Sequence, residues 1–465
     1  MQLDKDLQAR QEARELSRQA GLAQQALFSF SREQLDAIVE AIANAFSAAA
    51  PELAHMAVEE TGFGNVEDKI TKNQFASRSV LEAIRPMKTV GLLKESQGLW
   101  EVGVPVGVIA AIVPSTNPTS TVCYKAMIAL KSGNAIIFSP HPKALACTLQ
   151  AARIVAKAAE SAGAPRGCVG CLSIPSLEGC RELMGAEEVR LILATGGPAM
   201  VKAAYSSGKP AIGVGAGNGP AYLHHSCDLQ EALSKILRSK TFDNGTVCAS
   251  EQSIIVESVL AKAAEEKAKA MGYYFMDEKQ AAALAKLLFK PNGALSPEVV
   301  GRTARVLAEK AGFSVPQSTR VLVARETDAG KTYPYSHEKL CPVLAWFEVA
   351  DEDEAKKLAM KVLRHEGVGH TFSIHANNTD VVRRFCLEIP VSRFLVNAPA
   401  AQGGIGADTK LFPALTLGCG AVGGSASSEN ISPMDLVNIR KVAWGRNKED
   451  DLVEILTAKI LQRLQ

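Results

Sequence analysis

One cysteine in this chain stands in a context that suits covalent chemistry. Cys248 ends the segment FDNGTVC (242–248), which contains the turn-forming Asp-Asn-Gly, and it precedes the apolar run SIIVE, which predicts a strand. A turn before a strand would place Cys248 at the mouth of a loop, where its thiol can meet a substrate. A thiolate is the strongest side-chain nucleophile near neutral pH once a neighbouring group lowers its pKa. The alternative is a buried, inert cysteine, which is common for this residue type.

The composition argues against several other classes of protein. The 51 basic and 49 acidic side chains leave a net charge of +2, which indicates neither a nucleic-acid nor an acidic membrane partner. The N-terminus is charged and lacks a signal-peptide core, and the longest apolar run, 102–114, is broken by Pro105 and Gly107. The ten scattered cysteines are typical of reduced thiols in a cytoplasmic protein. Cys168 and Cys171 form a CxxC without a second ligand pair, so no metal site is predicted.

Strands and helices alternate on both sides of Cys248. Residues 12–50 carry helical periodicity, and Ser31 with Gln34 has the form of a capping box. Before Cys248 we predict strands at 107–113, 134–139, 168–174 and 189–194, with helices at 121–130, 145–162 and 176–184. After it we predict strands at 254–256, 320–324, 344–348, 370–375, 394–397 and 437–445, with helices at 259–271 and 280–288. This alternation predicts two parallel α/β units that meet at the glycine-rich hinge 213–220, with ligands at the carboxyl ends of strands.

Four motifs in a fixed order resemble the aldehyde dehydrogenase superfamily. They are the cysteine motif itself, GVIAAIVPSTNP (107–118), ATGG (194–197) and EKLCPV (338–343), and the resemblance runs from about residue 12 to residue 445. It implies an α/β fold of two Rossmann-like parallel-sheet domains with a small oligomerisation strand region. By this resemblance, 1–89 and 105–215 form the NAD-binding domain and 216–415 the catalytic domain. Residues 90–104 and 430–446 would be oligomerisation strands, giving a homodimer or homotetramer.

The resemblance also implies a role for each motif. Cys248 would attack an aldehyde, and Asn117 with the Cys248 backbone N–H would stabilise the resulting oxyanion. Hydride would pass to NAD, or to NADP. Gly196 and Gly197 would let the backbone approach the pyrophosphate, and Glu338 would bind the nicotinamide ribose. The alternative for Asn117 is an asparagine that only forms a turn, and the alternative for Glu338 is an exposed carboxylate without a ligand. The other expected cofactor-binding residues are Pro114, Thr116, Ser139, His141, Pro142, Thr195, Gly213, Val214, Gly215 and Leu340.

One departure from the family pattern predicts the acyl acceptor. Hydrolytic members carry a glutamate that activates water, and Gly213 stands in its place here. Without that general base, the acyl-enzyme would wait for a better nucleophile, and the thiol of coenzyme A (CoA) fits. The motifs FSPHPKA (138–144) and GVGHT (367–371) resemble the aldehyde dehydrogenase half of bifunctional aldehyde/alcohol dehydrogenases, and the chain stops where the alcohol half would begin. His370 could assist CoA, although a packed histidine is an equal alternative.

The sequence fits several functions. The leading one is a CoA-acylating aldehyde dehydrogenase with acetaldehyde as the default substrate. Propionaldehyde or a charged short aldehyde are alternatives, as is an acid-forming aldehyde dehydrogenase. A non-catalytic binding protein on the same fold is disfavoured because Cys248, Asn117 and Glu338 are all present.

The C-terminal segment 447–465 predicts an amphipathic helix behind a polar linker. Its apolar residues recur at three- and four-residue spacing. Such a helix either packs on its own oligomer or docks onto a partner. It is similar to the encapsulation peptides that load enzymes into bacterial microcompartments. A shell protein is therefore a candidate partner, and the compartment lumen a candidate location beside the cytoplasm.

Overall fold

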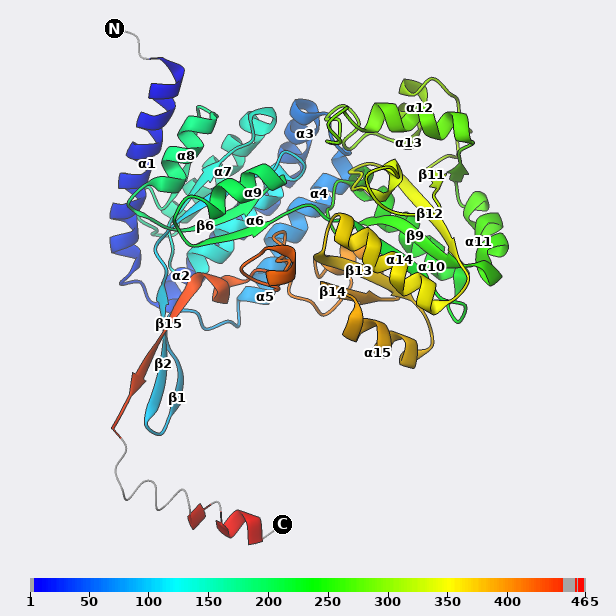
Figure 1. Cartoon of the computed structure of the whole chain (residues 1–465). Helices are drawn as coiled ribbons and strands as arrows, with labels where there is room; N and C mark the ends of the chain where they lie inside the picture. Colours follow the sequence, from blue (N-terminus) through cyan, green and yellow to red (C-terminus); the bar gives the residue numbers. More distant parts are fainter. Residues whose placement is uncertain (1–3, 446–455, 458, 464–465) are drawn as a thin grey trace.

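The computed structural model describes residues 4–445, 456–457 and 459–463. Its N-terminal part is helical (Figure 1). The first helix packs against the first sheet, and the following ones pack on helices that cover that sheet. Helix α2 begins as predicted, because Ser31 and Gln34 form a reciprocal capping box. The buried face of α2 carries Leu35, Ile38, Ile42 and Phe46 at helical spacing. The helices are α1 (Lys5–Leu27), α2 (Arg32–Ala48), α3 (Ala50–Thr61), α4 (Val66–Gln74) and α5 (Val80–Ile84).

Among the described residues the strands form three sheets, and the first is parallel throughout. It has five strands in the order β5-β4-β3-β6-β7. Its central strand β3 is buried at every position, as expected for a strand covered on both faces. The strands are β3 (Val108–Ile112), β4 (Ile136–Ser139), β5 (Val169–Cys171), β6 (Val189–Thr195) and β7 (Ala211–Val214), and the helices are α6 (Pro118–Lys131), α7 (Leu145–Ser161), α8 (Leu177–Gly185) and α9 (Pro198–Tyr205).

The second sheet has seven parallel strands in the order β10-β11-β12-β9-β8-β13-β14. It forms the right-hand body of Figure 1. Its strands are β8 (Gly219–Leu223), β9 (Glu251–Glu257), β10 (Tyr273–Phe275), β11 (Val321–Arg325), β12 (Val343–Val349), β13 (Gly369–His375) and β14 (Val391–Val396). Its helices are α10 (Leu229–Thr241), α11 (Ser258–Ala270), α12 (Glu278–Leu288), α13 (Ala304–Lys310), α14 (Glu352–His365), α15 (Thr379–Glu388) and α16 (Ala400–Gly404).

The third sheet is antiparallel and reaches away from both bodies (Figure 1). It pairs β1 (Gly91–Ser96) with β2 (Leu99–Pro105), and β2 with β15 (Val437–Ala443). The three sheets together confirm the predicted fold class of two parallel α/β units with a small additional strand region. The oligomerisation role of that region stays a prediction.

The predicted hinge at 213–220 is only partly irregular. Gly213 and Val214 end β7 and Gly219 begins β8, so residues 215–218 alone link the two parallel sheets. The sequence-based prediction also missed α9, α10, α13, α14, α15, α16, β7, β8 and β10. In α10 and α14 the buried apolar residues do recur at helical spacing, so the sequence carried the signal of an amphipathic helix and the prediction missed it.

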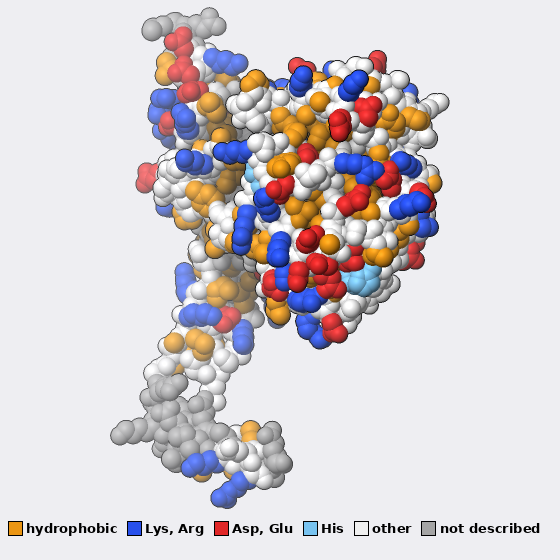
Figure 2. Space-filling view, turned by 45° about the vertical axis from the view of Figure 1, so that its right-hand side comes forward, with side chains coloured by type: hydrophobic (Ala, Val, Ile, Leu, Met, Phe, Trp, Pro, Cys, Tyr) orange, Lys and Arg blue, Asp and Glu red, His pale blue; other side chains and the backbone are white. Residues whose placement is uncertain are grey.

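The surface agrees with the composition. Figure 2 shows basic and acidic side chains interspersed over the visible face, as a net charge of +2 suggests. None of the helices in the described part of the chain has both the length and the apolar character needed to cross a bilayer.

Candidate active site

The loop before Cys248 is shaped by a turn with left-handed backbone. Asp243 and Asn244 have φ of 47° and 51°, values that aspartate and asparagine tolerate better than most residues. Gly245 follows with φ of 77°, and a Cβ there would lie 2.9 Å from the Cys341 carbonyl oxygen. Only glycine fits this position without a shift. The turn delivers Cys248 to the start of β9, partly exposed, as the sequence predicted.

Cys248 faces a cavity of about 480 Å³, a size suited to a cofactor or small ligand. Loops at the edges of both parallel sheets form its walls. Twelve of the predicted site residues line it: Pro114, Thr116, Asn117, His141, Thr195, Gly196, Gly197, Val214, Gly215, Cys248, Glu338 and Leu340. Their shared location supports the predicted roles, which the geometry alone does not test.

Four predicted residues do not line this cavity. Ser139 is buried at the end of β4, and Pro142 opens a short helical turn beside His141. Gly213 lies within β7 and His370 at the start of β13, and both are buried. Ser139 and Pro142 can therefore support the cavity wall through their neighbours but do not present a side chain to its interior.

The surroundings of Gly213 exclude a side chain. A Cβ at this position would lie 2.7 Å from Val201 Cγ1 and 2.8 Å from Tyr205 Cε2, both on α9. The Tyr205 hydroxyl accepts a hydrogen bond from Gly213 N at 2.9 Å and one from Ala426 N at 3.0 Å. Tyr205 thus occupies the space beside Gly213 and ties β7 to the 421–426 segment.

His370 lies behind the wall of the cavity. Its ring is fully buried, and its Cε1 would lie 3.2 Å from a Cβ at Gly217. Nδ1 pairs with the Thr371 hydroxyl at 2.8 Å, while Nε2 has no hydrogen-bond partner among the described residues. Burial and the charge of Arg393 hold the pKa of His370 well below its usual range, so the ring is neutral. A catalytic role for His370 stays a prediction.

The thiol of Cys248 is protonated at neutral pH when the cavity holds no ligand. Burial raises the pKa of Cys248 to about 12, and the charges of Glu338 and Cys419 add to the rise. Arg393 opposes it. The Arg393 guanidinium is 1% exposed and donates to the His370 and Gly418 carbonyl oxygens at 2.9 and 2.6 Å. The sequence suggested a neighbour that lowers this pKa, and Arg393 is the one that the structure supplies.

Asn117 is the N-cap residue of α6, lines the cavity and contacts the loop that carries Cys248. Its Nδ2 donates to the Thr246 carbonyl oxygen at 3.2 Å, and its Oδ1 accepts from Lys72 Nζ at 2.6 Å. Sequence reasoning missed Lys72, because a lysine in a helix is usually solvated and nothing in the local pattern indicates burial. It also missed Phe289, His337 and Glu366, which line the cavity too.

The cavity residues fit a dinucleotide. A Cβ at Gly197 or Gly215 would meet no described heavy atom within 4 Å, so a ligand has room to approach the backbone there. Gly197 is the N-cap residue of α9, where backbone N–H groups favour an anion. Glu338 Oε1 accepts from Gly217 N at 2.9 Å, which fixes the carboxylate at the wall. Burial, then the charge of Glu366, raise the pKa of Glu338 to about 8.

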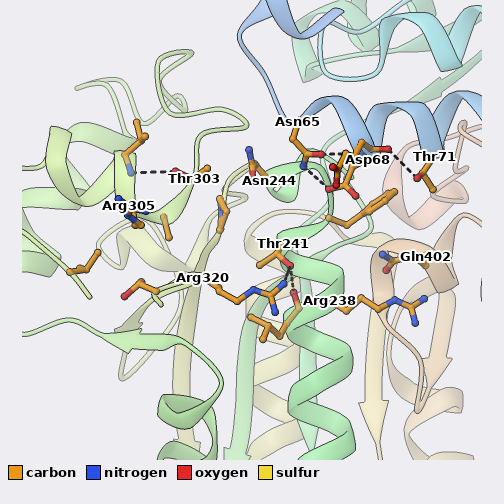
Figure 3. A pocket seen from close by; sticks show the side chains of 18 of the residues that line it. Asn65, Asp68, Thr71, Arg238, Thr241, Asn244, Thr303, Arg305, Arg320 and Gln402 are labelled. Atoms are coloured by element: carbon orange, nitrogen blue, oxygen red, sulfur yellow. Dashed lines mark hydrogen bonds between the residues drawn. The ribbon is translucent and has the colours of Figure 1, made fainter. Parts of the chain in front are cut away.

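A larger, polar cavity of about 1680 Å³ lies beside the first. Lys72 and Ile405 line both. Figure 3 shows Asn65, Asp68 and Thr71 projecting from one helix toward it, with Arg238 and Thr241 on another. Its described lining contains four basic and four acidic side chains: Lys72, Arg238, Arg305, Arg320, Glu67, Asp68, Glu309 and Asp408. The cavity therefore has no net preference for a charged ligand.

A cluster of possible metal ligands lies apart from both cavities. His224, His225 and Glu352 bring their ligand atoms within 4.8 Å of one another. His224 Nδ1 accepts from Ser226 N at 3.1 Å, and its Nε2 lies 2.9 Å from Glu352 Oε1. The neutral ring therefore carries its proton on Nε2 and donates it to Glu352. A metal on Nε2 would displace this proton, so the contacts favour a hydrogen-bonded network.

Comparison with known proteins agrees with this geometry. The model of the aldehyde dehydrogenase family matches residues 5–276, more than half of the chain. The chain belongs to the aldehyde dehydrogenase family, which confirms the predicted resemblance.

Two relatives match most of the chain at nearly half identity. The bifunctional aldehyde-alcohol dehydrogenase AdhE of Escherichia coli K12 is 46% identical over 428 residues, which cover 90% of this chain and 48% of that protein. The chain thus spans about half the length of the curated relatives it matches first. An acetylating aldehyde dehydrogenase from Geobacillus thermoglucosidasius has a crystal structure with a TM-score of 0.94 at 47% identity, covering 96% of this chain and 99% of that one.

A more distant solved structure shares the fold. The propionaldehyde dehydrogenase from the fucose utilisation microcompartment of Clostridium phytofermentans is 28% identical, with a TM-score of 0.84, and the match covers 92% of this chain and 96% of that one.

Proposed function

We propose that this chain is a CoA-acylating aldehyde dehydrogenase, which converts an aldehyde, CoA and NAD⁺ into acyl-CoA and NADH. The observation that carries the proposal is at Gly213. The residue that would activate water in a hydrolytic relative is absent, and Tyr205 fills the adjacent space. Cys248 and Asn117 nevertheless face one cavity, so the residues for forming an acyl-enzyme are present. The residue that would activate water to hydrolyse the acyl-enzyme is not.

The reaction follows from the residues at the cavity. Cys248 releases its thiol proton to solvent, and its sulfur bonds to the aldehyde carbon, whose C=O π electrons move onto oxygen and make it an oxyanion. Asn117 Nδ2 and the Cys248 backbone N–H donate to that oxygen. As the oxyanion collapses, the carbon loses hydride and becomes a thioester on Cys248. Bound NAD⁺ supplies the hydride acceptor, and Gly196, Gly197 and Glu338 would hold it. The CoA sulfur then attacks the thioester and Cys248 leaves as a thiolate.

The direct test measures NADH formation with and without CoA. With aldehyde and NAD⁺ alone, we expect a burst of NADH comparable to the enzyme concentration, because the acyl group stays on Cys248. Steady turnover should begin only when CoA is added. Continuous NADH and free acid without CoA would make the chain an acid-forming aldehyde dehydrogenase instead.

The aldehyde is short and uncharged under this proposal. The larger cavity, through which an aldehyde could reach Lys72 and the Cys248 loop, balances four acidic against four basic side chains. Acetaldehyde is the default, and propionaldehyde is the nearest alternative. A panel of acetaldehyde, propionaldehyde and an anionic semialdehyde tests this, and a kcat/KM highest for the anionic member would contradict it.

The domain roles and assembly belong to the same proposal. Residues 1–89 and 105–215 would bind NAD, 216–415 would carry the nucleophile, and 90–104 with 430–446 would pair subunits into a dimer or tetramer. The small antiparallel sheet exposes Leu92, Leu99 and Ile439, apolar side chains that a partner subunit could cover. Sedimentation showing only a monomer would contradict this.

The segment 447–465 would direct the enzyme to a microcompartment. Most of it lies outside the described residues, but Leu456, Ile460 and Leu461 are described as helical and are more than half exposed. The microcompartment propionaldehyde dehydrogenase among its relatives supports the idea. Deleting 447–465 should leave activity intact and abolish co-sedimentation with shells. Loss of the oligomer on deletion would assign the helix to packing.

A further inference from the structure

A buried cluster of charges connects the two sides of the active site. Lys69 and Lys72 come from α4, and Asp243 comes from the turn that precedes Cys248. Their side chains are 4%, 2% and 0% exposed. Asp243 Oδ2 accepts from Lys69 Nζ at 2.9 Å and from Lys72 Nζ at 2.6 Å. Two lysines share the Asp243 carboxylate, and the Asp68 carboxylate accepts from Asp243 N at 2.7 Å beside them, so a charged network is enclosed beside the Cys248 loop.

Lys72 extends this cluster to the oxyanion donor. Besides Asp243, its Nζ donates to Asn117 Oδ1 at 2.6 Å and to Thr246 Oγ1 at 3.1 Å. An ammonium has three protons, and these three contacts use them all. Burial lowers the pKa of Lys72 to about 8, and Asp243 opposes that fall, so the group is still mainly an ammonium at pH 7. The other charged groups that influence it are Lys69 and Asp68.

The contact fixes which way the Asn117 amide faces. If the amide were rotated by 180°, its NH₂ group would meet the Lys72 ammonium, which has no acceptor to offer. Oδ1 must therefore face Lys72, and Nδ2 must face the opposite way, where it donates to the Thr246 carbonyl oxygen at 3.2 Å and to the Thr116 hydroxyl at 3.3 Å. These contacts use both Nδ2 protons, so an oxyanion would replace one of these two long contacts. A charge-assisted bond at Oδ1 also draws electron density from the amide, which makes its N–H groups stronger donors.

We propose that Lys72 is a positioning residue for the oxyanion site, acting through Asn117. This inference rests on the proposed function. The ammonium holds the amide so that Nδ2 can donate to the oxyanion formed on Cys248, and it polarises that donor. Because preorganised donors stabilise developing charge without reorganisation, the gain falls on the transition state and not on substrate binding.

Lys69 provides a matched control on the same helix. It shares Asp243 with Lys72 and is as deeply buried, but its second contact is the Thr116 carbonyl oxygen at 3.0 Å, not Asn117. A role limited to holding the Asp243 turn would make the two lysines equivalent. A role through Asn117 belongs to Lys72 alone.

The experiment is a double-mutant cycle on the full chain. Lys72→Met, Asn117→Ala, the double variant and Lys69→Met are compared for kcat, for the KM of NAD⁺ and aldehyde, and for the rate of the NADH burst without CoA. We expect Lys72→Met to lower kcat about tenfold or more, with each KM changed less than about twofold. In the Asn117→Ala background, Lys72→Met should have little further effect. Lys69→Met should lower Tm like Lys72→Met while its kcat falls much less.

Lys72→Gln keeps an N–H donor without the charge and serves if Lys72→Met does not fold. Its kcat should lie between those of wild type and Lys72→Met. Additive losses in the cycle, or equal kcat losses for Lys69→Met and Lys72→Met, would overturn the inference. A wild-type enzyme that shows the burst and CoA-dependent turnover keeps the proposed function even then. A wild type without either would refute the proposed function itself.

Discussion

The two cavities on either side of Lys72 are lined by different types of residue. The smaller one, which holds Cys248, is lined largely by glycines, prolines and apolar side chains at loop ends of both parallel sheets. The larger one is lined by charged and polar side chains, many of them on helices (Figure 3). In the smaller cavity, glycines leave room for a ligand to approach the backbone. In the larger cavity, side chains from helices supply the charged groups, so a ligand there would meet side chains and not backbone.

The largest effect should follow from removing the nucleophile in the smaller cavity. Cys248→Ala should abolish both the NADH burst and CoA-dependent turnover, because the covalent step is lost. NAD⁺ binding, measured by fluorescence titration, should persist, since the lining is otherwise unchanged. Appreciable residual turnover would mean that another group carries the chemistry.

The next effect concerns the oxyanion donor. Asn117→Ala should lower kcat by about 10²-fold, as for other oxyanion donors, with a smaller change in KM. Steady-state kinetics with acetaldehyde measure this. An unchanged kcat would remove Asn117 from the site and would also remove the basis for a role of Lys72.

A third change attempts to restore hydrolysis. Gly213→Glu alone should not produce steady acid formation without CoA, because the new side chain would collide with Val201 and Tyr205 on α9. Its Tm should fall, since the backbone or α9 must shift. Adding Tyr205→Ala makes room, and slow NADH formation without CoA is then expected. Rapid hydrolysis by the single variant would show that Tyr205 does not block the position.

A smaller effect should follow from changing the charge of the larger cavity. Glu309→Lys gives its described lining five basic and three acidic side chains. The KM for an anionic semialdehyde should fall a few-fold at low salt, while that for acetaldehyde stays constant. Lys310→Glu, on the same helix but outside the lining, is the control. Equal responses of both aldehydes would show that the cavity does not lie on the substrate's path.

The smallest effect concerns stability and pH in the smaller cavity. The folded pKa of Glu338, about 8, lies above its unfolded value. As pH rises from the unfolded value toward 8, the unfolded chain ionises first, so this group progressively destabilises the fold. Glu338→Gln keeps an acceptor for Gly217 N and should raise Tm by a degree or two at pH 8.5 but not at pH 4. An equal change at both pH values would exclude this origin.

The sequence predicted the parts of the site that depend on local chemistry. The turn before Cys248, the asparagine before Pro118 and the glycines at 196–197 are recognisable because their residue types match a local backbone requirement. Asn117, Gly196, Gly197 and the Cys248 that follows the turn line one cavity. Apolar strands such as β3 and β6 were predictable for the same reason. The short strand β10, with its three residues, carries too little pattern.

What the sequence could not predict depends on long-range packing. Lys72 is recognisable as functional only when α4 lies against the 242–246 turn, far away in the chain. The block at Gly213 depends on the orientation of the Tyr205 ring, and the burial of His370 on its position behind Gly217. No spacing rule encodes these contacts.

The contact between Gly64 and Asp243 has a consequence for how the enzyme folds. A Cβ at Gly64 would lie 1.7 Å from Asp243 Oδ1, and the adjacent Asn65 N donates to that oxygen across 178 residues of chain. The loop that carries Cys248 therefore takes its shape only after the N-terminal helices and the second sheet have come into contact. Contacts of such sequence separation form slowly. During refolding, the active-site geometry should therefore form after the secondary structure. A newly made chain should have no catalytic activity until the N-terminal helices and the second sheet have docked.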